Sequence, residues 1–227
     1  MRPGRLPCAM LAGLVAVSAG WGQALRSGPD AWPVFRGDGG LSGVSSVSLQ
    51  PPLALRWTWR DADHLLTSPV IADGRVFVGS TAGRVICLEA ATGKIVWSRA
   101  VGSAVEAPPV VDGAALYVST SDGVVMRLQA ASGRPRWSFA AGGRIAGSAN
   151  IHRRGSLATV VVGSYDGSLY GLDAGTGERR WSFTTGNFIN GAPSVAGNLV
   201  VFGGCDARLH LLSAIDGREV SSVDTGS

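Results

Sequence analysis

The chain has 227 residues, 45% of them hydrophobic, which is enough for a packed core and excludes an intrinsically disordered chain. Its 33 glycines, 11 prolines and single lysine, together with the lack of a long helix-favouring segment, exclude a helical bundle or a coiled coil. The formal net charge of +4 falls to +2 (18 basic against 16 acidic residues) without Arg2 and Arg5 of a predicted leader, and the charges are scattered, so no nucleic-acid partner is expected.

Residues 1–24 are typical of a secretory signal peptide. Two arginines precede an apolar run from Cys8 to Ala19, and Gly22-Gln23-Ala24 places small residues where a signal peptidase reads them. The run is too short to span a bilayer, and no later segment is apolar enough, so we expect no transmembrane segment in the mature chain. Cys8 lies before the apolar run, whereas a lipid-carrying cysteine follows it. The sequence therefore predicts a periplasmic or extracellular protein that is not lipid-anchored.

Residues 25–56 are predicted to form either an extended N-terminal strap or a flexible linker. A glycine- and serine-rich stretch follows Asp30-Ala31-Trp32-Pro33-Val34-Phe35-Arg36-Gly37. If the segment is a strap, Trp32 and Phe35 are the residues expected to anchor it. The composition alone leaves both alternatives open.

From residue 57 onward the chain repeats itself about every 40 residues. Tryptophans recur with spacings of 40, 40 and 44 at Trp57, Trp97, Trp137 and Trp181. Glycines recur with spacings of 40, 44 and 40 at Gly93, Gly133, Gly177 and Gly217. The four extra residues lie near His152-Arg153-Arg154-Gly155. Independent markers in one register indicate a true internal repeat.

Each unit is predicted to form four short antiparallel strands. In the first unit, runs rich in Val, Ile and Leu are separated by turns at Asp73-Gly74, Ala82-Gly83 and Thr92-Gly93. About 40 residues and four strands per unit indicate a β-propeller blade, whereas a β-sandwich does not explain a fixed period. We therefore predict an all-β propeller. Its parts are a lone outer strand at 57–67 and blades at 68–107, 108–147, 148–191 and 192–227.

The residues at the end of each unit carry a recurring pattern. The four copies read EAATGKIVW, QAASGRPRW, DAGTGERRW and SAIDGREVS, the last with Ser221 in place of the tryptophan. This pattern resembles the repeat of the pyrroloquinoline-quinone (PQQ)-type propellers, which include quinoprotein alcohol dehydrogenases and BamB-type outer-membrane assembly propellers. The resemblance implies that the repeated tryptophans and glycines dock neighbouring blades, and that a full ring holds seven or eight blades. Since this chain holds four blades plus a strand, we expect a fragment of a longer protein.

No catalytic residue, metal ligand or cofactor is predicted from the residues themselves. Turns such as Asp122-Gly123 and Asp166-Gly167 supply one carboxylate each, whereas calcium takes six to eight oxygen ligands. The three histidines have no metal-binding spacing, and His210 is expected to be a packed strand residue because it aligns with apolar or aromatic residues in the other units. PQQ with calcium is expected only if the chain is part of a dehydrogenase.

The loops that join successive blades are the predicted binding surface. Packing does not dictate their residues, and all of them open onto one face near the central channel. The aligned loop positions hold Leu66, Glu106, Ala146 and Asn190, with His64, Ala104, Arg144 and Phe188 two positions earlier. The candidate binding residues are Glu106, Arg144, Asn187, Phe188 and Asn190.

Three functions fit these patterns. The first is a non-catalytic exported scaffold for other exported or envelope proteins or for a small ligand, similar to the BamB-type propellers. The alternative is part of a PQQ-dependent alcohol or sugar dehydrogenase. A third is the extracytoplasmic sensor module of a larger receptor.

Overall fold

The computed structural model describes residues 31–226, which form four antiparallel sheets of four strands each. The strands are β1 (Val70–Ala72), β2 (Arg75–Gly79), β3 (Arg84–Glu89), β4 (Ile95–Ala100), β5 (Val110–Asp112), β6 (Ala115–Ser119), β7 (Val124–Gln129), β8 (Pro135–Ala140), β9 (Asn150–Arg154), β10 (Leu157–Gly163), β11 (Ser168–Asp173), β12 (Arg179–Thr184), β13 (Ser194–Ala196), β14 (Leu199–Gly203), β15 (Arg208–Ser213) and β16 (Glu219–Asp224). Each sheet contains four strands that are consecutive in the chain, so each repeat unit forms one sheet and the all-β class is confirmed. The signal peptide predicted at 1–24 lies outside the described residues. Among residues 31–226, no helix has the length and apolarity needed to cross a membrane.

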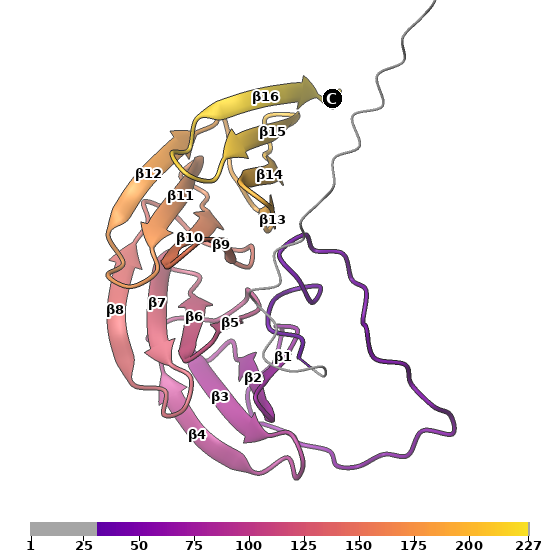
Figure 1. Ribbon diagram of the computed structural model, residues 1–227. Helices are drawn as coiled ribbons and strands as arrows, with labels where there is room; N and C mark the ends of the chain where they lie inside the picture. Colours follow the sequence, from indigo (N-terminus) through magenta and orange to yellow (C-terminus); the bar gives the residue numbers. More distant parts are fainter. Residues whose placement is uncertain (1–30, 227) are drawn as a thin grey trace, which may run out of the picture.

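The four sheets stand side by side in an arc, as the blades of a propeller do (Figure 1). The first strand of each blade lies on the inner side of the arc, and the fourth strand lies on the outer side. Tight turns make this possible: Asp73 and Gly74 both have positive φ angles, of 50° and 68°, which matches a two-residue hairpin. The glycine-containing turns of the sequence are therefore the points where each blade folds back on itself.

The hydrophobic core lies between neighbouring blades. Phe77 and Cys87 of the first blade belong to one buried cluster with Leu116 of the second blade. Equivalent clusters join the second blade to the third and the third to the fourth. Cys87 has no exposed surface, and burial raises the pKa of its thiol.

Each repeated tryptophan contacts the blade that follows it. The indole Nε1 groups of Trp57, Trp97, Trp137 and Trp181 donate to the carbonyl oxygens of Ala90, Ala130, Ala174 and Ala214 at 2.9, 2.9, 3.1 and 3.3 Å. The same rings lie over the repeated glycines, where a Cβ atom would come within 2.6 to 2.7 Å of the indole. These glycines also have positive φ angles, so both the space and the backbone conformation favour glycine there.

The segment 57–67 forms no strand, which corrects the predicted lone outer strand. Within the described chain no neighbouring strand pairs with it, so its backbone lacks the ladder of hydrogen bonds that defines a strand. Trp57 still reaches the first blade through its hydrogen bond to Ala90. The segment therefore makes the same tryptophan contact as the fourth strand of a blade, although it does not form a strand.

Residues 32–40 run along the inner strands of all four blades. The backbone and side-chain contacts, at 2.7 to 2.9 Å, join Trp32 to Ile71, Pro33 to Val111, and Gly39 to Asn150 and Val195. Val34 is completely buried, and the expected anchors Trp32 and Phe35 are both partly buried. This part of the N-terminal segment is thus a strap, and its anchors are Trp32 and Val34.

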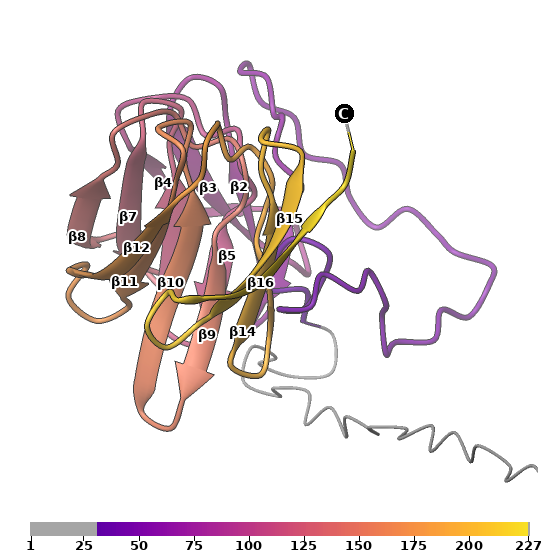
Figure 2. The ribbon, with the colours of Figure 1, turned by 90° about the horizontal axis from the view of Figure 1, so that it is seen from above.

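The four extra residues of the third unit lengthen one hairpin. Strands β9 and β10 contain five and seven residues, whereas the matching strands of the other blades contain three and five. The β9–β10 hairpin projects beyond the neighbouring strands on one face of the arc (Figure 2).

Candidate functional site

Four of the five predicted binding residues form one row across the loops that join the blades. Glu106 lies between β4 and β5, Arg144 lies between β8 and β9, and Asn187 and Phe188 lie between β12 and β13. We call this row, completed by Tyr165 of the β10–β11 turn, the loop-face row. Asn190 is exposed in the same loop as Phe188 but lies outside the contacts described below.

A repeated backbone hydrogen bond positions every one of these loops. The amides of Thr81, Ser121, Tyr165 and Cys205, in the turn between the second and third strands, donate to the carbonyls of His64, Ala104, Arg144 and Phe188 at 3.0, 2.8, 2.8 and 2.8 Å. Each loop is thereby held to the blade that it enters. Because the backbone fixes the loop, the side chains at these positions are free to differ between units.

Arg144 links the second blade to the third. Its Nη2 donates to Oε2 of Glu106, and its Cζ atom lies 5.5 Å from the centroid of the Tyr165 ring, in a cation–π arrangement. The hydrogen bond to Glu106 raises the pKa of the Arg144 guanidinium, which therefore stays charged. Both side chains of the ion pair are partly exposed, at 47% and 27%, so the pair contributes only about 0–1 kcal/mol to stability. Its main effect is to orient the guanidinium against the tyrosine.

The aromatic ring of Phe188 is exposed and yet held in place. It stacks on Tyr165 with a centroid distance of 5.3 Å and an interplanar angle of 17°, while 52% of the residue remains accessible. Asn187 fixes the backbone beside it: Oδ1 of Asn187 accepts from the Phe188 amide at 2.8 Å, and Nδ2 donates to the carbonyl of Cys205 at 3.1 Å. The result is an exposed aromatic group whose position is set before any partner binds.

Tyr165 was not among the residues predicted from the sequence. It occupies the turn position that holds Thr81, Ser121 and Cys205 in the other units. The sequence does contain a signal that could have identified Tyr165, because an aromatic residue replaces small side chains in one copy of a repeated turn. Only the structure shows that this turn lies between two inter-blade loops.

The turn carboxylate of Asp166 makes hydrogen bonds within its own blade and to the loop that precedes it. Asp166 accepts from the Tyr170 hydroxyl at 2.6 Å and from the amides of Gly142 and Ser168 at 2.7 and 2.8 Å. Burial alone would raise the pKa of Asp166, but these hydrogen bonds outweigh it and hold the pKa below its usual value. This carboxylate is therefore a structural acceptor that ties Gly142 to the turn.

His210 is a packed strand residue with two acidic neighbours. It is 4% exposed, stacks on Phe202 at 5.1 Å, and lies 2.9 Å from both Asp206 and Glu219 through its two ring nitrogens. Within residues 31–226, no three His, Cys, Asp or Glu side chains are grouped so that they could hold a metal ion.

Comparisons with known proteins find one family model that matches this chain. A family model described as "Outer membrane protein assembly factor BamB" matches residues 26–157 and 151–226. No curated protein matches the sequence.

Several solved structures resemble the chain. BamB from Moraxella catarrhalis is 23% identical with a TM-score of 0.66, and the match covers 74% of this chain and 56% of that one. Quinohemoprotein alcohol dehydrogenases from Comamonas testosteroni and from Pseudomonas putida HK5 (ADHIIG) are both 16% identical with TM-scores of 0.72. Those matches cover 89% and 87% of this chain but 42% and 40% of the dehydrogenases. Identities this low show the propeller fold alone, and the chain spans 40–56% of the length of these structures.

Proposed function

This chain belongs to the BamB family of PQQ-repeat propellers, and we propose that it is an exported, non-catalytic scaffold that binds another envelope protein through the loop-face row. The observation that carries this proposal is the exposed Phe188 ring, stacked on Tyr165 and flanked by Arg144. Aromatic and arginine side chains contribute most of the binding free energy at protein interfaces. The family description, an assembly factor for outer membrane proteins, supports an envelope partner.

The charge balance of the row favours an apolar anchor from the partner. Glu106 neutralises Arg144, so the row presents a paired ion next to an aromatic ring. An apolar or aromatic side chain that covers Phe188 would bury its exposed half, while Arg144 and Asn187 would form the polar margin. Since the ring is already held by Tyr165 and by the Asn187 hydrogen bonds, little conformational entropy is lost on binding.

Site-specific photo-crosslinking in the natural host tests the proposal. A photoreactive residue at position 188 is expected to capture one envelope protein, and Arg144→Ala is expected to reduce the yield. The control is the same photoreactive residue at Ser132, which is exposed in the β7–β8 turn at the opposite end of the strands. Equal capture at both positions, or a yield that Arg144→Ala leaves unchanged, would contradict the proposed face.

Affinity measurements with the captured partner sharpen the test. Phe188→Ala is expected to raise the Kd at least about tenfold, as is typical of an aromatic anchor. Asn190→Ala is the matched control, because Asn190 is exposed in the same loop but lies outside the row. An equal effect of the two variants would refute the role of the aromatic ring.

A dehydrogenase would behave differently in a binding experiment. If the chain is a scaffold, titration with PQQ in the presence of calcium is expected to show no saturable binding. Saturable binding, followed by dye-linked oxidation of an alcohol or sugar, would overturn the scaffold proposal.

A further inference from the structure

A cavity of about 260 Å³ lies between the second and third blades, at the end of the strands opposite the loop-face row. Its walls come from the β5–β6 hairpin, the β9–β10 hairpin and the β11–β12 turn. The charged residues that line it are Arg127, Arg153, Arg180, Asp112 and Asp173. Three cations and two anions leave a net charge of +1.

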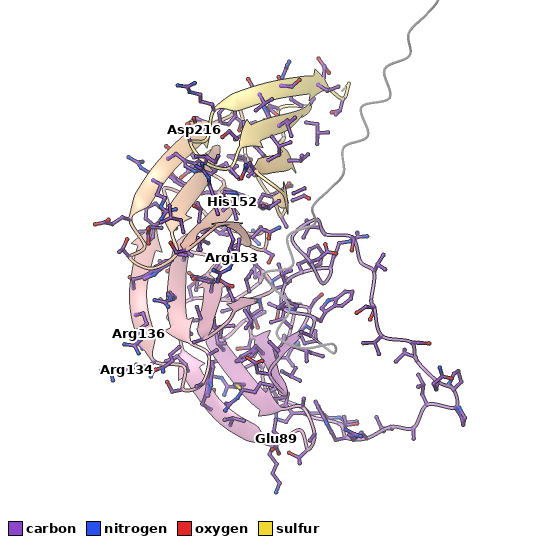
Figure 3. The ribbon with its side chains drawn as sticks, in the orientation of Figure 1. Glu89, Arg134, Arg136, His152, Arg153 and Asp216 are labelled. Atoms are coloured by element: carbon purple, nitrogen blue, oxygen red, sulfur yellow. The ribbon has the colours of Figure 1, made fainter. Side chains whose placement is uncertain are left out.

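Two arginines that have no counterpart in the other units line this cavity. Arg127 pairs in register with Tyr117 and Trp137, at the position that holds Cys87, Gly171 and Leu211 in the other blades. The other units thus place a small or apolar residue at this position of the third strand, whereas the second unit places a guanidinium there. Arg153 comes from the lengthened β9–β10 hairpin, which only the third unit has among the described blades. Figure 3 shows Arg153 on the inner side of the arc.

Two of the three arginines are already neutralised. Arg153 donates to Asp112 through Nη2 and through Nε, the latter at 3.1 Å, and Asp112 is 6% exposed. Arg180 donates to Asp173 at 2.5 Å and to the Thr159 hydroxyl at 2.9 Å. The Arg153 pair joins two walls of the cavity, and neither pair leaves a free charge on its arginine.

Arg127 has no such partner. Its Nη1 donates to the carbonyl of Gly175 at 3.5 Å, its guanidinium also lies beside the Tyr117 hydroxyl, and its Nε is the one buried side-chain nitrogen or oxygen in residues 31–226 without a hydrogen bond. A buried donor on a charged group that lacks an acceptor is unfavourable, because the group has lost its hydration without gaining a hydrogen bond. Because Arg127 lines the cavity, an acceptor bound there can reach the guanidinium.

We propose that this cavity binds the carboxylate group of a small organic molecule and that Arg127 is its ligand-binding residue. The two terminal nitrogens of a guanidinium offer parallel N–H groups that match the two oxygens of a carboxylate. One carboxylate neutralises the net charge of +1, whereas a phosphate dianion would leave an uncompensated negative charge beside Asp112 and Asp173. The volume of about 260 Å³ is below that of typical drug-sized pockets, so it favours a ligand with a short hydrocarbon part.

The remaining lining fits this ligand. Ala114, Leu157 and Ala158 give an apolar wall for the hydrocarbon part. The Tyr117 hydroxyl donates to the carbonyl of Ala174 at 3.2 Å. Burial, reinforced by Asp112, raises the pKa of Tyr117 to about 12, so the phenol keeps its proton and adds no competing negative charge.

Nuclear magnetic resonance of the arginine Nε–Hε groups tests the proposal directly. Acetate and butyrate serve as carboxylate probes, with inorganic phosphate and chloride at the same ionic strength for comparison. We expect a saturable shift of the Arg127 signal with the carboxylates, stronger with butyrate than with acetate, and weaker binding of phosphate. A shift that grows linearly without saturation, or phosphate that binds as tightly as butyrate, would overturn the proposal.

Two variants complete the test. Arg127→Leu, which introduces the residue that the fourth blade has at this position, is expected to weaken butyrate binding at least about tenfold. Arg136→Leu is the matched control, because Arg136 is an exposed arginine at the outer margin of the arc (Figure 3) and should leave binding unchanged. Retained binding in Arg127→Leu, or equal loss in both variants, would refute the assignment. If Arg127→Leu does not fold, the titration of the unmodified protein still decides the outcome.

Discussion

The substitution Gly177→Ala tests how much the close contact between tryptophan and glycine contributes to the stability of the propeller, because it adds a single methyl group at that contact. Gly177 has a φ angle of 80°, a left-handed conformation that destabilises alanine by about 1–2 kcal/mol. The added Cβ would also lie 2.6 Å from Cδ2 of Trp137, whereas carbon atoms in contact are normally about 3.5–4.0 Å apart. The indole would have to move by about 1 Å, and overpacking of this kind costs about 1–3 kcal/mol. Gly177→Ala is therefore expected to lower the free energy of unfolding by about 2–5 kcal/mol.

Gly113→Ala is the matched control for the backbone effect. Gly113 has a φ angle of 56°, and a Cβ atom there would meet no other atom within 4 Å. Only the conformational contribution of about 1–2 kcal/mol applies. Urea unfolding followed by circular dichroism yields both values, and the difference between the two variants is the cost of displacing the indole.

A double-mutant cycle tests whether the indole of Trp137 causes the extra destabilisation by Gly177→Ala. In a Trp137→Ala background, the ring is gone and Gly177→Ala should cost only its conformational contribution. The coupling free energy between the two sites is therefore expected to be about 1–3 kcal/mol. Equal destabilisation by Gly177→Ala and Gly113→Ala, or a coupling free energy near zero, would refute the argument that the ring sets the spacing of the blades.

Three further outcomes follow from individual side chains. Asp166→Asn is expected to lower the free energy of unfolding by about 1 kcal/mol at neutral pH. Because folding lowers the pKa of Asp166, this difference is present above its ordinary value of 3.8 and disappears as the pH falls through the folded pKa; a pH-independent difference would contradict it. Phe188→Ala should change the Tm by less than about 2 °C, whereas Phe202→Ala, at a residue only 3% exposed, should lower the free energy of unfolding by about 3–5 kcal/mol in thermal or urea unfolding. A thiol reagent should modify exposed Cys205 in the folded protein, as read by intact mass, and buried Cys87 only after unfolding; simultaneous modification would contradict the burial of Cys87.

The repeat explains where function can arise in this molecule. Positions that dock blades are nearly identical in every unit, because each unit faces the same packing problem. The loop-face row and the Arg127 cavity both use positions that differ between units, and both connect the second blade to the third. They lie at opposite ends of the same strands, so variants of one site can be tested without altering the other.

The arrangement of strands could be predicted because it depends on local and periodic features of the sequence. Glycine turns such as Asp73-Gly74 mark where a strand reverses, and a 40-residue period marks a repeated sheet. The segment 57–67 shows the limit of this reasoning. It has the residues of a fourth strand, but a strand exists only where a neighbouring backbone pairs with it.

The sequence by itself determined the all-β class and the loops whose side chains vary, since both follow from the spacing of residues along the chain. Only the tertiary structure decided which variable residues meet. Tyr165 and Phe188 are stacked although they belong to different blades, and Arg127 faces the Arg153 hairpin across a blade interface. These contacts depend on how far one rigid sheet is rotated and displaced from the next. That geometry results from the packing between blades, and it cannot be predicted from the spacing of residues within one unit.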